Sequence, residues 1–140
     1  MSCVATPGTP PSATAQDCGG GQGITICSDQ TFSANSLGSG AVEELEPFSS
    51  DPPWTGCLDN GESQSSWYYF AASSGGTIAF TIDPHNGSDD YDFAIWGPYS
   101  NVNCPAFSGQ APLRCSYSLI SDQTGLRSTP VDFSEGAGGD

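Results

Sequence analysis

The sequence predicts an all-β protein, in particular an antiparallel, jelly-roll-like β-sandwich that contains disulfide bonds. Short runs of aromatic and β-branched residues recur along the chain with turn-forming residues between them, a pattern typical of sandwiches. Apolar residues do not repeat at helical spacing over any useful length. The 140 residues suffice for one hydrophobic core, and they include 6 cysteines, 18 glycines and 11 prolines, which favours a disulfide-bonded secreted domain.

The first part of the chain divides into a tether and the start of the module. Residues 1–17 are rich in Pro, Ser, Thr and Ala, which predicts a linker or tether, and we expect the sandwich module to occupy residues 18–140. Short strands are predicted at residues 24–27 and 31–33. Residues 49–61 contain several Pro and Gly residues and are predicted to form a long irregular connection.

The middle of the chain carries the strongest strand signal. Residues 66–72 form an aromatic run, residues 73–76 read Ser-Ser-Gly-Gly, and residues 77–83 alternate between apolar and polar side chains. We therefore predict a β-hairpin with a turn at residues 73–76. The residues of its second strand that we expect to point inward are Ile78, Phe80 and Ile82.

The remaining strands are predicted from shorter patterns. Residues 88–96 and 114–120 are strand candidates, residues 122–129 are rich in turn formers, and residues 131–133 are short and partly apolar. Side chains alternate along a strand, so residues 88–96 should bury Tyr91, Phe93 and Ile95 on one face. The other face begins with Asp90 and Asp92.

The charge of the chain excludes some partners. The formal net charge is -14, with 16 acidic residues against two arginines, Arg114 and Arg127, and no lysine. A surface that follows nucleic-acid phosphates needs clustered Lys and Arg, so we expect no nucleic-acid partner, and binding to anionic membranes is disfavoured. No apolar run has membrane-spanning length, which predicts no membrane insertion. A cation or a neutral polymer such as a glycan remains a candidate partner.

The cysteines are predicted to form disulfides. There is no CxxC pair and a single histidine, which disfavours zinc and redox sites. Two local pairs are expected from the loops that they bracket, Cys18 with Cys27 and Cys104 with Cys115. Each would stabilise the fold by roughly 2 to 4 kcal/mol. The pairing of Cys3 and Cys57 is left open.

Three carboxylates at the start of the strand at residues 88–96 form the candidate metal site. Asp89, Asp90 and Asp92 are named the acidic entrance below. Neighbouring carboxylates repel one another unless a cation lies between them, and calcium prefers oxygen ligands of this kind. The sequence therefore predicts bound Ca²⁺. The alternative is an exposed acidic loop in which Asp89 forms a turn.

Aromatic residues near the acidic entrance are the candidate ligand contacts. Trp96 and Tyr99 could stack on sugar rings, although most aromatics of a small sandwich fill the core. No catalytic residue is predicted. His85 is the only histidine and no nucleophile elbow is present, and Asp90 and Asp92 lie on one strand face, where they do not flank a substrate. Residues 86–88 read Asn-Gly-Ser, formally an N-glycosylation sequon.

A set of motifs in a fixed order carries a family resemblance. They are Asp17-Cys18 with Ile26-Cys27, Glu44-Leu45, Gly61-Glu62 before Ser66-Trp67-Tyr68, Gly76-Thr77-Ile78, the residues 89–96, Arg114-Cys115-Ser116, and the residues 134–140. With these motifs the chain resembles β-sandwich repeats of large secreted surface proteins of gliding bacteria, and more distantly the bacterial pre-peptidase C-terminal domain. The resemblance implies non-catalytic modules of exported adhesins and exoenzymes. It also implies that Glu44 and Glu62 approach Asp90 and Asp92, as further calcium ligands.

The resemblance has one departure. Such repeats continue past the Gly-rich segment into two further strands, whereas this sequence stops at Asp140. Either the chain is a fragment, or a neighbouring module or identical subunit supplies the strands by complementation, because an unpaired sheet edge invites strand addition. We therefore expect a non-enzymatic extracellular module for cell-surface adhesion or assembly, stabilised by calcium. The alternatives are a glycan-binding accessory module of a secreted enzyme and a filament or surface-layer subunit.

Overall fold

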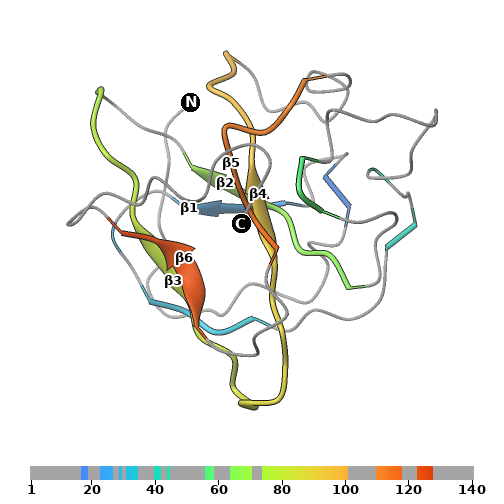
Figure 1. Cartoon of the computed structure of the whole chain (residues 1–140). Coiled ribbons are helices and arrows are strands. Elements are labelled where there is room, and N and C mark those ends of the chain that lie inside the picture. The colour runs from blue at the N-terminus through green and yellow to red at the C-terminus, as the bar shows by residue number, and fades with distance from the viewer. Residues whose placement is uncertain are drawn as a thin grey trace. The chain divides into compact units, whose positions relative to one another are not determined.

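The computed structural model contains strands and no helix in the part of the chain that it describes. The described residues are 17–18, 23–26, 29, 31–34, 40–41, 44, 56–58, 64–70, 74–100, 110–117 and 123–127. Their strands, shown in Figure 1, are β1 (Ile24–Ile26), β2 (Tyr68–Phe70), β3 (Phe80–Ile82), β4 (Phe93–Ile95), β5 (Arg114–Ser116) and β6 (Thr124–Leu126). The all-β prediction is confirmed for these residues.

The chain divides into two compact units, each of which is described by itself. The first unit comprises residues 1–46, 61–75 and 101–106, and it contains β1 and β2. The second unit comprises residues 47–60, 76–100 and 107–140, and it contains the other four strands.

The first unit is built on a parallel strand pair. β1 and β2 pair in the register Ile24 to Tyr68 and Ile26 to Phe70, and the backbone N–H of Ile24 also donates to the carbonyl oxygen of Trp67 (2.9 Å). A parallel pair needs a long connection, which the residues between the two strands supply. This pair departs from the predicted antiparallel arrangement.

An aromatic contact beside this pair explains a second difference. Residues 31–33 were predicted as a strand, but they make no ladder pairing in the structure. Phe32 is half-buried instead, with its ring centroid 5.7 Å from that of Tyr68 and the ring planes tilted by 41°. The apolar side chain of this segment therefore packs against β2 without its backbone joining the sheet.

The second unit contains two antiparallel pairs. β3 pairs with β6, with Thr81 opposite Gly125, and β4 pairs with β5, with Ala94 opposite Cys115. Figure 1 shows β6 alongside β3. The backbone N–H of Leu113 donates to the carbonyl oxygen of Ile95 (2.6 Å) just beyond the β4–β5 ladder.

Two side-chain contacts join these pairs into one core. The rings of Phe80 on β3 and Phe93 on β4 meet edge to face, with centroids 5.1 Å apart. The Thr124 hydroxyl on β6 donates to the Ser116 hydroxyl on β5 (3.4 Å). Phe93, Cys115 and Ser116 are all buried, so the centre of the second unit lies between the two ladders.

The predicted hairpin at residues 66–83 is wrong in its pairing. β2 pairs with β1 and β3 pairs with β6, and within the described residues no ladder joins β2 to β3. A hairpin must pair directly after its turn, whereas residues 77–79 are exposed and outside the ladder. Ile78, predicted to point inward, is 44% exposed, while Phe80 and Ile82 are half-buried.

β6 lies in the segment that was predicted to be only turn-rich. Gly125 at its centre has a φ of 143°, a conformation that favours glycine. Glycine is depleted in strands, so the sequence pattern of this segment did not predict β6. The short, partly apolar stretch at residues 131–133 lies outside the described residues.

Candidate functional site

The acidic entrance is exposed and follows a hydrogen-bonded turn. Asp89, Asp90 and Asp92 are exposed, whereas Phe93 at the start of β4 is 8% exposed. This agrees with the predicted alternation of faces at the beginning of the strand. Farther along, Ala94 and Trp96 are half-buried like Ile95, so both faces of β4 are partly covered.

The turn at Asn86 fixes the start of the acidic entrance. The backbone N–H of Asp89 donates to the Asn86 carbonyl oxygen (2.9 Å), and the backbone N–H of Ser88 donates to Asn86 Oδ1 (3.3 Å). Asn86 Nδ2 donates to Asp89 Oδ1 (3.4 Å). Asn is favoured at such positions because its side chain mimics the backbone of a turn. Asp89 therefore closes a turn, as the alternative interpretation expected.

The calcium prediction stays a prediction. Within the described ranges, no three or more His, Cys, Asp or Glu side chains are grouped so that they could hold a metal ion. The structure places Asp89, Asp90 and Asp92 in the second unit and Glu44 in the first. Glu62 lies outside the described residues.

Glu44 belongs to a second polar cluster, which we name the Cys18 clamp: Asp17, Cys18, Ala41, Glu44 and Tyr69. The backbone N–H of Cys18 donates to Glu44 Oε1 (2.8 Å), and the Tyr69 hydroxyl donates to the Cys18 carbonyl oxygen. The backbone N–H of Ala41 donates to Asp17 Oδ1 (2.8 Å). Cys18 is 2% exposed and disulfide-bonded. The clamp thus supplies partners for both backbone polar groups of a buried residue.

Gly23 leaves room for the Tyr69 ring of the clamp. A Cβ at Gly23 would lie 2.7 Å from Tyr69 Cδ2 and Cζ, well inside van der Waals contact. The sequence did not predict the clamp, since its hydrogen bonds join residues that are up to 51 positions apart. The available signal was that Asp17-Cys18 and Glu44-Leu45 both occur among the motifs of the family resemblance.

Burial and charge act together on Tyr69. Burial, and then the negative charge of Glu44, raise the pKa of the Tyr69 hydroxyl above its ordinary value. Both causes oppose formation of the phenolate, because it would be a second negative charge at a partly buried position. We conclude that Tyr69 acts as a neutral hydrogen-bond donor.

Replacing Tyr69 by phenylalanine should lower the free energy of unfolding by about 1 kcal/mol at neutral pH, through loss of the hydrogen bond to Cys18. A raised pKa in the folded state means that this group's stabilisation is complete below the unfolded pKa and is lost as pH rises through the folded pKa. Urea unfolding across alkaline pH should therefore show a weaker decline for Tyr69→Phe than for the original chain. Tyr91→Phe, which removes a hydroxyl from another half-buried tyrosine, is the control. Equal alkaline declines for Tyr69→Phe and the original chain would contradict the clamp.

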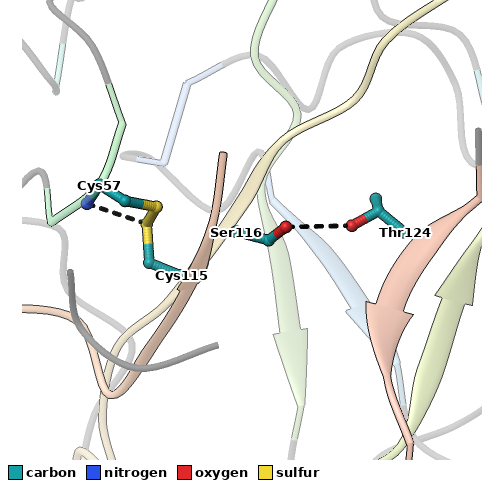
Figure 2. Close-up of a disulfide and its surroundings, with 4 residues drawn as sticks. All are labelled: Cys57, Cys115, Ser116 and Thr124. Atoms are coloured by element: carbon teal, nitrogen blue, oxygen red, sulfur yellow. Dashed lines mark hydrogen bonds between the residues drawn. A yellow bond between two sulfur atoms is a disulfide. The ribbon is translucent and has the colours of Figure 1, made fainter. Parts of the chain in front are cut away.

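A disulfide joins Cys57 to Cys115 in the second unit. The two residues are 58 positions apart in the sequence, and their Cα atoms are 5.9 Å apart. The backbone N–H of Cys57 also donates a hydrogen bond to Cys115 Sγ (3.1 Å). Figure 2 shows the bond beside the hydrogen bond between Ser116 and Thr124. Cys115 lies at the middle of β5 with 0% of its surface exposed.

This disulfide corrects the predicted pairing of Cys104 with Cys115. The pairing of Cys104 with Cys115 was predicted from the loop that the two residues bracket. A disulfide requires Cα atoms within about 7 Å of each other. In the folded chain it is Cys57 that lies within this distance of Cys115. Cys57, which had no assigned partner, is therefore bonded. Cys18 is also disulfide-bonded, while Cys27 and Cys104 lie outside the described residues.

The two candidate ligand contacts have different environments. Trp96 is half-buried, whereas Tyr99 is 36% exposed and its hydroxyl donates to Gln110 Oε1 (3.0 Å). Burial raises the pKa of the Tyr99 hydroxyl, so the ring carries a neutral polar end at the surface. This arrangement is compatible with stacking on a ligand, and the contact role stays a prediction.

Comparison with known proteins gives no match: no family model, no curated protein and no solved structure corresponds to this chain. Within the described residues, no helix has the length and apolar character needed to cross a membrane.

Proposed function

We propose that this chain is a non-catalytic extracellular β-sandwich module for cell-surface adhesion or assembly, stabilised by calcium. The observation that carries the proposal is the Cys57–Cys115 disulfide, in which one sulfur belongs to Cys115, the most deeply buried of the described residues of the second unit. Disulfides persist in oxidising compartments such as the cell exterior. The bond holds an irregular segment to β5, which suits a small domain that is exposed to the exterior.

The arrangement of the second unit supports the sandwich part of the proposal. Its two antiparallel ladders meet through Phe80 and Phe93 and through Ser116 and Thr124. Side chains that interdigitate between two ladders are the basis of a sandwich core. In the proposed jelly roll, the strands needed to complete each sheet come from the rest of the chain or from a neighbouring subunit.

Charge supports the calcium part of the proposal. A net charge of -14 in 140 residues opposes the compact state through self-repulsion, and bound divalent cations would reduce it. The proposed ligands are Asp89, Asp90 and Asp92, with Glu44 and Glu62 from the family resemblance. Trp96 and Tyr99 are proposed as contacts with the partner surface.

Beads coated with the disulfide-bonded chain test the adhesive function. We expect them to aggregate, or to bind cell-surface polysaccharide, in calcium and to disperse in chelator, with a higher melting temperature in calcium because a ligand of the native state stabilises it. Asp90→Asn should weaken both effects. Asp29→Asn, which removes another exposed carboxylate, should leave them unchanged.

Beads that stay dispersed in calcium and bind no cell-surface polysaccharide would contradict the adhesive function. An unchanged melting temperature with no heat of calcium binding would contradict calcium stabilisation alone. Glycan binding that Trp96→Ala abolishes would favour the accessory module of a secreted enzyme instead. Ordered polymers under electron microscopy would favour assembly by strand complementation.

A further inference from the structure

The turn before the acidic entrance contains a reactive pair of residues, Asn86 and Gly87. Asn86, Gly87 and Ser88 are all exposed. The side-chain amide carbon of an asparagine lies within reach of the backbone nitrogen of the next residue, and their reaction closes a five-membered ring. A side chain on that next residue hinders ring closure, so Asn followed by Gly is the most favourable sequence for it.

The space beside Gly87 is open. A Cβ placed on Gly87 would meet no atom beyond the chain neighbours within 4 Å, so no other segment crowds the Cα that is bonded to the nucleophilic nitrogen. The two side-chain hydrogen bonds of Asn86, 3.3 Å to Ser88 N–H and 3.4 Å to Asp89, are long and exposed and therefore restrain the amide weakly.

One of these hydrogen bonds also favours the chemistry. The Ser88 N–H donates to Asn86 Oδ1, which polarises the amide carbonyl and stabilises negative charge that develops on Oδ1 during attack. Backbone donors stabilise a developing oxyanion most strongly within about 3.1 Å. At 3.3 Å the Ser88 N–H therefore gives modest assistance, and the exposed Asn-Gly pair remains the main cause of reactivity.

We infer that Asn86 is a site of spontaneous deamidation through a succinimide formed with Gly87. The Gly87 backbone nitrogen forms a bond to Asn86 Cγ and gives its proton to water, while the bond from Cγ to Nδ2 breaks and the amide nitrogen leaves as ammonia after taking up a proton. Water then opens the ring. Cleavage of the ring nitrogen from Cγ gives aspartate, and cleavage from the main-chain carbonyl carbon gives isoaspartate.

The modification changes the acidic entrance. The donor Nδ2 that faces Asp89 is lost, and a new carboxylate takes its place beside Asp89 and close in sequence to Asp90. Isoaspartate in addition lengthens the backbone by one methylene inside the turn that the Asp89 N–H closes onto the Asn86 carbonyl. The inference is independent of the proposed function, since it rests on the turn alone.

The experiment incubates the folded full chain in mildly alkaline buffer and follows each asparagine by peptide mapping and by enzymatic methylation of isoaspartate. We expect the peptide with Asn86 to accumulate aspartate and isoaspartate together, several-fold faster than the peptides with Asn101 and Asn103. Gly87→Ala should slow the conversion several-fold without changing the fold, and Asn86→Gln should abolish it at this site.

Several results would overturn the inference. They are an Asn86 peptide that stays intact while Asn101 or Asn103 converts, aspartate formed at Asn86 without isoaspartate, or an unchanged rate in Gly87→Ala. The peptide with Asn60 and Gly61, a second Asn-Gly pair in the sequence, is mapped in the same samples and verifies that the conditions support the chemistry.

Discussion

Replacing Cys57 and Cys115 together by alanine is expected to lower the free energy of unfolding by about 4 kcal/mol. The bond closes a loop across a separation of 58 positions, and the chain entropy removed from the unfolded state by a loop of that size gives this magnitude. Single domains are stable by only about 5–15 kcal/mol. The double variant should therefore lose a large share of its stability, and its melting temperature should fall by about 15 °C.

Urea unfolding separates this entropic effect from damage to the core. If the bond acts on the unfolded state, the double variant should show a larger dependence of unfolding free energy on urea, because an unlinked chain exposes more surface. Its near-ultraviolet circular dichroism should remain native. Unchanged stability, or a Cys104–Cys115 peptide in maps of the original chain, would contradict the disulfide described here.

Five of the six described strands were predictable from local composition. Aromatic and β-branched runs placed five strands inside predicted segments, namely β1, β2, β3, β4 and β5. Their partners could not be predicted in the same way. Pairing of β1 with β2, or of β3 with β6, depends on contacts between residues far apart in sequence, and alternating patterns do not encode which remote edge will be adjacent.

The candidate site shows the same division between local and remote information. The exposure of Asp90 and Asp92 and the burial of Phe93 follow from alternation along one strand. The hydrogen bond of Glu44 to Cys18 crosses 26 positions, and no local pattern indicates it. Glu44 was predicted as a calcium ligand, whereas in the structure it accepts a backbone N–H. A carboxylate is chemically suited to either role, so its presence in the sequence does not distinguish them.

Gly125→Ala is expected to lower the free energy of unfolding by about 3 kcal/mol or more. Two costs combine at this position. The φ of 143° is a conformation that residues with a Cβ rarely adopt. The new Cβ would also lie 3.0 Å from Phe80 C and Thr81 Cα, and closer still to the Phe80 carbonyl oxygen. Those atoms are the backbone of the paired strand β3, so they cannot rotate away as a flexible side chain could.

Two other glycines separate the costs. Gly97 has a φ of 126°, but its Cβ would meet only ordinary contacts, the nearest at 3.5 Å to Tyr99 N, so Gly97→Ala isolates backbone strain. Gly87→Ala meets no atom within 4 Å and should change stability by at most about 0.5–1 kcal/mol. Urea midpoints should therefore fall in the order Gly87→Ala, Gly97→Ala, Gly125→Ala. Equal midpoints for Gly97→Ala and Gly125→Ala would contradict the close approach of β6 to β3, because that approach is what should make the substitution at Gly125 the more costly of the two.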